Sequence, residues 1–169
     1  MVQNNHIKKE FTKVNCKVIT ISDTRTLETD TSGKLMIELL KEKNHDAADH
    51  TIIKDDVNEI RKEVLLGVQS PSIEAILLNG GTGISPRDVT IEAVKPLLTK
   101  ELDGFGEIFR MLSFTEDIGS AAILSRAIAG TINQKIVICT PGSTGAVRLA
   151  MKRMILPELS HMVSEIHKI

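Results

Sequence analysis

Short apolar segments rich in β-branched residues recur along the chain and alternate with longer segments of helical periodicity. The short segments predict strands over residues 14–22, 51–54, 75–79 and 135–140. The third of them is apolar at successive positions, as expected of a strand that helices cover on both faces. These segments therefore predict the interior of a sheet.

Apolar residues three or four positions apart predict helices between these strands. The first helix begins at the capping residue Ser32, and the second begins at Asp55 or Asp56. Further helical patterns run from about residue 90, over 104–115, over 118–129 and after residue 157.

Alternating strands and helices predict an α/β fold: a Rossmann-like three-layer sandwich, with a mostly parallel sheet and helices on both faces. We expect one domain over residues 14–169, preceded by a flexible polar leader over residues 1–13. In such sheets ligands bind beyond the carboxyl ends of the strands, where the strand order reverses. The loops after Ser22, Lys54, Asn79 and Thr140 are therefore the candidate binding loops.

Composition narrows the function. The 169 residues carry a net charge of −1 and are 41% apolar, which excludes disorder as the main state. With no Trp, no Tyr and no basic excess, the chain lacks the means to bind nucleic acid. Its apolar runs are too short to span a membrane and its start is polar, so we expect a cytoplasmic protein with reduced, buried Cys16 and Cys139.

The sharpest motif is the glycine-rich segment that follows the predicted strand 75–79. Gly80, Gly81 and Gly83 let the backbone approach a ligand and turn its amides toward an anion. Thr82 adds a hydroxyl and Arg87 adds a cation. The spacing matches neither the dinucleotide fingerprint nor a P-loop. The alternative is a tight turn in which the glycines serve geometry alone.

Two acidic residues follow predicted strand ends on the same edge of the sheet. Asp55 and Asp88 are each as well explained as helix N-caps as by a catalytic role. Together, however, they would repel a phosphate bound at the glycine loop unless a cation lay between them. Mg²⁺, which prefers carboxylate, water and phosphate oxygens, is the natural candidate.

A second loop repeats the design of the first. Pro141, Gly142 and Ser143 follow a strand and lead into a helix, so two anion sites on one edge suggest several phosphates or two phosphorylated ligands. Arg110 and Arg126 lie in mostly apolar patterns and either reach to water at the rim or clamp an anion. No histidine or cysteine is placed to make a covalent nucleophile.

Taken in order, these motifs resemble the molybdopterin-binding family. The matching segments are Gly-Gly-Thr-Gly with Ser85 to Thr90, Gly-Phe-Gly-Glu with Arg110, Leu-Ser-Arg-Ala at 124–127, and Pro-Gly-Ser at 141–143. The resemblance runs from about Val14 to the C-terminal helix.

By resemblance, the expected activity is adenylylation of molybdopterin, in which the molybdopterin phosphate attacks the α-phosphate of Mg-ATP and pyrophosphate is released. The resemblance implies Asp55 and Asp88 as the catalytic acids, which we expect to hold Mg²⁺, and homotrimers or homohexamers as the assembly. The residues implied around the substrates are Gly80, Gly81, Thr82, Gly83, Ser113, Ser125, Pro141, Gly142 and Ser143. The alternatives are a non-catalytic molybdopterin-binding or carrier protein and a structural subunit with a vestigial site.

Overall fold

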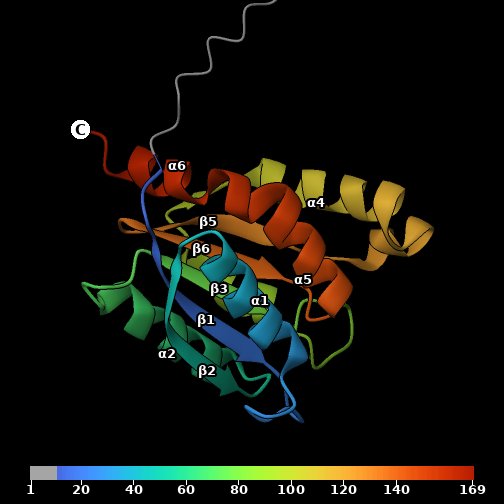
Figure 1. Cartoon of the computed structure of the whole chain (residues 1–169). Helices are drawn as coiled ribbons and strands as arrows, with labels where there is room; N and C mark the ends of the chain where they lie inside the picture. Colours follow the sequence, from blue (N-terminus) through green and yellow to red (C-terminus); the bar gives the residue numbers. More distant parts are fainter. Residues whose placement is uncertain (1–10) are drawn as a thin grey trace, which may run out of the picture.

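The computed structural model describes residues 11–169, and a six-stranded sheet lies at the centre of this part of the chain (Figure 1). The strands lie in the order β2-β1-β3-β6-β5-β4. Their bounds are β1 (Asn15–Ile21), β2 (Asp46–Ile53), β3 (Ala75–Asn79), β4 (Lys100–Glu101), β5 (Ile128–Ile132) and β6 (Lys135–Thr140). The pairs of β1 with β2, β1 with β3 and β3 with β6 are parallel, and those of β5 with β6 and β4 with β5 are antiparallel. The prediction of a mostly parallel sheet is confirmed.

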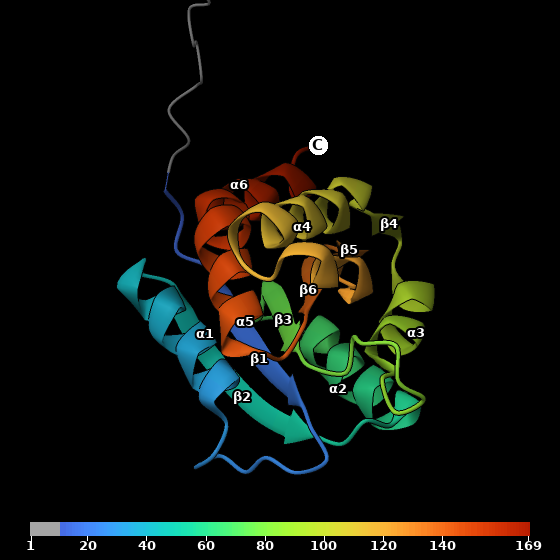
Figure 2. The same cartoon turned by 90° about the vertical axis from the view of Figure 1, so that its right-hand side faces the viewer.

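Helices cover both faces of the sheet, as Figure 2 shows. The α-helices are α1 (Thr31–Glu42), α2 (Val57–Gln69), α3 (Thr90–Val94), α4 (Asp103–Glu116), α5 (Thr144–Ala150) and α6 (Leu156–Ile166). Two 3₁₀ segments, η1 (Lys95–Leu97) and η2 (Gly119–Leu124), and a π-helical segment, η3 (Met151–Ile155), complete the set. Side chains of α1, α4, α5 and α6 share one apolar core, and those of α2 and α3 share the other. Within residues 11–169, no helix combines the length and apolar character needed to cross a bilayer.

Successive side chains of the central strands point to opposite faces of the sheet, and this alternation explains the two apolar cores. In β3, Leu77 packs into the core under α1, while Ile76 and Leu78 pack into the core under α2. All three side chains are fully buried, and burying each contributes about 1.5–3 kcal/mol. A strand that is buried on both sides must be apolar at successive positions, which is the pattern that the sequence shows.

The strand order reverses beside β1. The chain passes from β1 through α1 to β2 at one edge, and then through α2 back across β1 to β3. The loops after β1 and β3 therefore diverge at a topological switch point, where α/β sheets bind their ligands. The loop after β6 is adjacent, because β6 is the next strand in the sheet.

One predicted helix is wrong. Residues 118–129 form the short η2 turn and the first residues of β5 instead of a helix. β5 pairs with β6 through a tight turn in which Asn133 adopts a positive φ of 53°. The apolar spacing in this segment resembles that of a helix, but the hairpin buries Ala129 and Ile132 in the sheet, and strand pairing overrides the local pattern.

Smaller differences lie at element ends. β2 begins at Asp46, earlier than the predicted 51, because an edge strand of half-exposed residues has little apolar alternation. Asp30 caps α1, in place of the predicted Ser32. The helix predicted from about residue 90 is confirmed at its start but is only five residues long. Of the predicted leader, residues 1–10 lie outside the described residues, and Lys13 pairs with Asp46 at 2.8 Å.

Candidate functional site

The loops after three neighbouring strands meet at the carboxyl edge of the sheet. Gly80, which follows β3, has a φ of 100°, and its backbone N–H donates to the carbonyl of Thr140 at 3.0 Å. A Cβ at Gly80 would lie 2.3 Å from the carbonyl oxygen of Ile21, at the end of β1. A Cβ at Gly142 would lie 3.0 Å from Gly80 Cα. Glycine is therefore required for the two predicted binding loops to touch each other and β1.

A cleft of about 290 Å³ opens where these loops meet. Its lining combines the first glycine loop, the second loop and the segment after η2: Gly80, Gly81, Thr82, Gly83, Asp88, Leu124, Ser125, Pro141 and Gly142. The structure thus brings together most of the residues that the sequence suggested as ligand contacts, although they come from three separate parts of the chain.

Asp55 and Asp88 also converge on the first glycine loop. A Cβ at Gly81 would lie 2.5 Å from Asp55 Oδ1, and a Cβ at Gly83 would lie 2.7 Å from Asp88 Oδ2. Neither acid caps a helix. Asp56, the neighbour of Asp55, caps α2 by accepting from two backbone N–H groups, whereas Asp88 accepts from the N–H of Ser85 at 3.0 Å within the loop. The cap alternative is wrong for both acids.

Asp55 lies in an environment that disfavours its negative charge. Burial, followed by the nearby carboxylates of Asp23 and Asp88, raises the pKa of Asp55, and the Arg87 guanidinium offsets part of this effect. Asp55 Oδ1 is buried and has no hydrogen-bond partner among the described residues. A cation bound between the acids would satisfy this oxygen and relieve the repulsion.

The carboxylates of Asp55 and Asp88 could hold Mg²⁺ only if other ligands completed the site. Among residues 11–169, no cluster of three or more acidic, histidine or cysteine side chains is arranged to hold a metal ion by itself. Mg²⁺ in proteins is commonly held by one or two carboxylates, completed by water and substrate phosphates. Asp55 and Asp88 beside the glycine loop are compatible with a site of that kind, which water and a phosphate ligand would complete.

The three predicted serines differ in position. Ser125 lines the cleft. Ser113 is buried in α4, and its backbone carbonyl accepts from the N–H groups at 117 and 118. Ser143 caps α5 by accepting from the N–H of Ala146 at 3.2 Å. Of the three side chains, Ser125 alone forms part of the cleft wall.

The three predicted arginines also differ. Arg87 is exposed in the glycine loop, and Arg110 is half-buried in α4. Arg126 is engaged by other groups of the protein. Its guanidinium donates to the backbone carbonyls of Thr82 and Gly83 and pairs with Glu92 of α3.

Sequence reasoning missed a buried polar network centred on Asp30. This fully buried residue caps α1, and its Oδ1 accepts from the N–H of Gly33 at 2.9 Å. Its Oδ2 accepts from Thr20 Oγ1 at 2.6 Å and lies 3.0 Å from His50 Nε2. Burial alone would raise the pKa of Asp30, but these hydrogen bonds outweigh it and hold the pKa below its ordinary value.

The network extends from Asp30 to the second loop. Ser32 Oγ donates to Asn79 Oδ1 at 2.8 Å, so the end of β3 is joined to the start of α1. Arg25 donates to Ser32 Oγ and, at 3.4 Å, to the carbonyl of Gly142. The available sequence signal was an aspartate just before Thr-Ser-Gly, which is a capping pattern.

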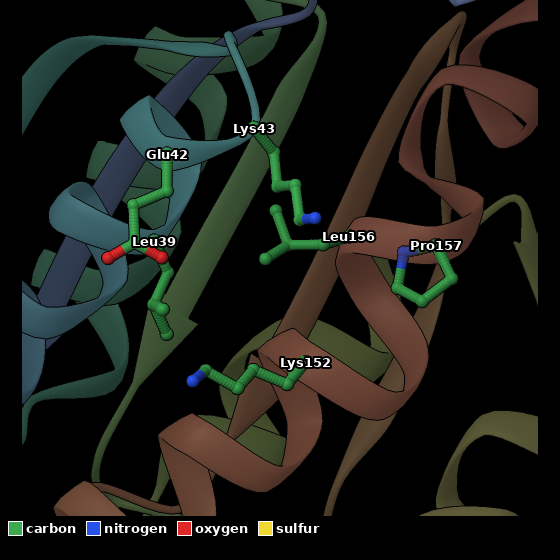
Figure 3. A pocket seen from close by; sticks show the side chains of 6 residues that line it. All are labelled: Leu39, Glu42, Lys43, Lys152, Leu156 and Pro157. Atoms are coloured by element: carbon green, nitrogen blue, oxygen red, sulfur yellow. The ribbon is translucent and has the colours of Figure 1, made fainter.

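A further groove, of about 560 Å³, lies between the end of α1 and the start of α6 (Figure 3). Lys43 and Lys152 extend their side chains at its sides, and Leu39 and Leu156 form its apolar part. α1 and α5 both begin at the edge that carries the glycine loops, so this groove lies toward the other end of α1. None of the predicted site residues lines it.

The fold and the cleft together define a class of protein. Residues 17–161 match the family described as a probable molybdopterin binding domain, and the chain belongs to that family. The resemblance that the sequence motifs suggested is thereby confirmed.

Particular relatives narrow the position within the family. The chain is 62% identical over 155 residues to molybdenum cofactor biosynthesis protein B of Bacillus subtilis (strain 168), covering 92% of this chain and 91% of that protein. A crystal structure of a molybdenum cofactor biosynthesis protein B matches with a TM-score of 0.91 and 58% identity, covering 92% of this chain and 97% of that one. The tungsten cofactor synthesizing protein MoaB from Pyrococcus furiosus matches with a TM-score of 0.82 and 35% identity, covering 92% and 98%. These relatives, each at least 35% identical over most of the chain, are named as molybdenum cofactor biosynthesis protein B or MoaB.

Proposed function

We propose that this protein acts in molybdenum cofactor biosynthesis and catalyses the Mg-ATP-dependent adenylylation of molybdopterin. The relatives with which it shares most of its length are named for molybdenum cofactor biosynthesis. The observation that carries the catalytic part is the buried, unpartnered Oδ1 of Asp55 beside Asp88 and the glycine loop. A pure binder of anionic ligands would gain nothing from two carboxylates at this position.

The chemistry needs no protein nucleophile. A phosphate monoester is an anion at neutral pH, so the molybdopterin phosphate oxygen forms a bond to the α-phosphorus of ATP while the bond from that phosphorus to the β-phosphate oxygen breaks. Pyrophosphate takes the electron pair and leaves. Such a transfer depends mostly on positioning and on neutralising charge.

The residues of the chain have distinct roles in this proposal. Asp55 and Asp88 would hold Mg²⁺, which would supply positive charge to offset the repulsion among the phosphates. The backbone N–H groups of the glycine loop stabilise negative charge on the transferred phosphate. Ser125 and the Pro141–Gly142 turn border the remainder of the ligand.

The principal alternative is a non-catalytic molybdopterin-binding or carrier protein that uses the same loops. It predicts that Asp55→Asn or Asp88→Asn binds molybdopterin as well as the unchanged protein or better, since a negative charge near the ligand is lost. An enzyme loses turnover in both variants while it still binds. A structural subunit with a vestigial site predicts no shift in melting temperature with any of these ligands, because a ligand selective for the folded state must stabilise it.

The deciding experiment incubates the protein with molybdopterin and Mg-ATP and measures adenylylated pterin and pyrophosphate. Asp56→Asn is the matched control, because it removes a carboxylate next to Asp55 while asparagine still caps α2. We expect turnover in the unchanged protein and in Asp56→Asn, and a loss of at least about 100-fold in Asp55→Asn. Absence of product from the unchanged protein, with molybdopterin bound, would establish the carrier alternative.

We also propose that the protein assembles as a homo-oligomer, a trimer or hexamer, through α4 and η2. Large apolar side chains are unusually exposed there: Leu102, Ile108, Met111, Phe114, Ile118, Ile123 and Leu124 are each at least 40% exposed. Several large apolar side chains exposed on neighbouring segments are typical of protein interfaces. Sedimentation velocity tests this proposal.

A further inference from the structure

The backbone carbonyl groups of residues 80–83, in the first glycine loop, all accept hydrogen bonds from Thr90 or Arg126. The Gly80 carbonyl accepts from Thr90 Oγ1 and the Gly81 carbonyl accepts from the Thr90 N–H, each at 2.9 Å. The next two carbonyls are bound by Arg126. Its Nε donates to Thr82 at 2.9 Å, and its Nη2 donates to Gly83 at 2.7 Å. Four consecutive carbonyls are therefore held by two residues.

Fixing a carbonyl also fixes the N–H group of the following residue. A trans peptide is planar, with its C=O and N–H pointing in opposite directions, and no peptide bond in the described part of the chain is cis. The N–H groups of residues 81–84 must then point away from Thr90 and Arg126. Among residues 11–169, these N–H groups find no acceptor.

Arg126 is itself oriented by Glu92. Both carboxylate oxygens of Glu92 accept from the guanidinium, and the hydrogen bond from Arg126 lowers the pKa of Glu92. The ion pair is half-exposed, so its contribution to stability is small. Its effect is to hold the planar guanidinium in the orientation that reaches two adjacent carbonyls.

We propose that Arg126 is a positioning residue, which acts from behind the glycine loop to aim its N–H groups at a phosphate in the cleft. The proposal rests on the proposed function, since it requires a phosphate ligand there. It differs from direct anion binding, because all three nitrogens of the Arg126 guanidinium donate to backbone carbonyls or to Glu92. A planar fork of donors is needed for this role, and lysine offers the charge without the fork.

The test compares Arg126→Lys with Arg61→Lys. Arg61 also donates to backbone carbonyls, those of Ala93 at 3.1 Å and Glu92 at 3.4 Å, but it lies on α2. Binding of Mg-ATP is measured by calorimetry, and the amide resonances of residues 81–84 are followed by NMR during titration with inorganic phosphate. Melting temperatures establish that each variant is folded.

We expect Arg126→Lys to bind Mg-ATP about tenfold more weakly and to lose the phosphate-dependent shifts of the loop amides, because misaligned donors to a charged group lose most of their value. Arg61→Lys should bind within about twofold of the unchanged protein. Glu92→Gln provides a second variant, in which the guanidinium of Arg126 loses the carboxylate that orients it toward the two loop carbonyls. Weaker binding in Glu92→Gln supports the positioning role.

Two results would overturn the inference. The first is unchanged binding in Arg126→Lys, and the second is tighter binding in Glu92→Gln, which would identify Arg126 as a direct anion contact released from its partner. If the unchanged protein shows neither Mg-ATP binding nor amide shifts, the proposed function fails together with the inference. If only the variants behave unexpectedly, the proposed function stands and the inference alone fails.

Discussion

Replacing Gly81 by alanine tests the geometry of the glycine loop most directly. Gly81 has a φ of 65°, a conformation that costs an L-residue about 1–2 kcal/mol. Its new Cβ would lie 2.4 Å from Thr90 Oγ1 and 2.5 Å from Asp55 Oδ1, so both side chains must move. Moving Thr90 breaks its hydrogen bond to the buried Gly80 carbonyl, and the strained contacts and the lost bond together cost about 2–3 kcal/mol more.

Gly119→Ala is the matched control. Gly119 has a φ of 60°, and nothing lies within 4 Å of an added Cβ, so this variant pays the backbone cost alone. We expect Gly119→Ala to lose about 1–2 kcal/mol and Gly81→Ala to lose about 3–5 kcal/mol of unfolding free energy. For a chain of this size, each kcal/mol lowers the melting temperature by about 2–4 °C.

Urea unfolding followed by far-ultraviolet circular dichroism measures both variants, since the chain contains neither Trp nor Tyr for fluorescence. The result that refutes the reasoning is an equal loss in the two variants. Equal losses would mean that a side chain at Gly81 meets neither Thr90 nor Asp55, and the convergence of Asp55 on the loop would then be wrong.

Three further predictions concern single side chains. Asp30→Asn should destabilise the protein by about 2 kcal/mol at pH 7, because charge-assisted hydrogen bonds are lost. Since the pKa of Asp30 is lowered, the difference in unfolding free energy between the two proteins should disappear as the pH falls below about 4, as urea titrations can measure. Asp55→Asn should stabilise the ligand-free, Mg²⁺-free protein by on the order of 1 kcal/mol at pH 7. Since the pKa of Asp55 is raised, this gain in stability should appear only above about pH 4. Thermal melts that show a lower melting temperature for the variant at pH 7 would contradict this prediction. Met111→Glu, on the exposed face of α4, should lower the sedimentation coefficient of the assembly, whereas Leu65→Glu on α2 should leave it unchanged.

Local patterns were reliable where one strand or one turn decided the outcome. The continuous apolar run of β3 and the glycines directly after it identified both a buried strand and its ligand-binding loop. Local patterns failed at β5, where the apolar spacing resembled that of a helix but pairing with β6 determined the structure. They also failed at Arg126, since the carbonyls that it binds belong to a loop distant in sequence.

The sequence by itself determined the α/β class, the loops that carry the chemistry and the family, because each depends on residues close together in the chain or on motifs in a given order. Tertiary structure alone decided that Asp55 and Asp88 both approach the first glycine loop, that Asp30 joins β1, α1 and β3, and that Arg126 lies behind the glycine loop rather than in the cleft. These contacts follow from the parallel pairing of β1 with β2 and β3, which brings the ends of distant strands to one edge. No local pattern of residues encodes such a meeting, because the free energy that holds it comes from the packing of the whole sheet.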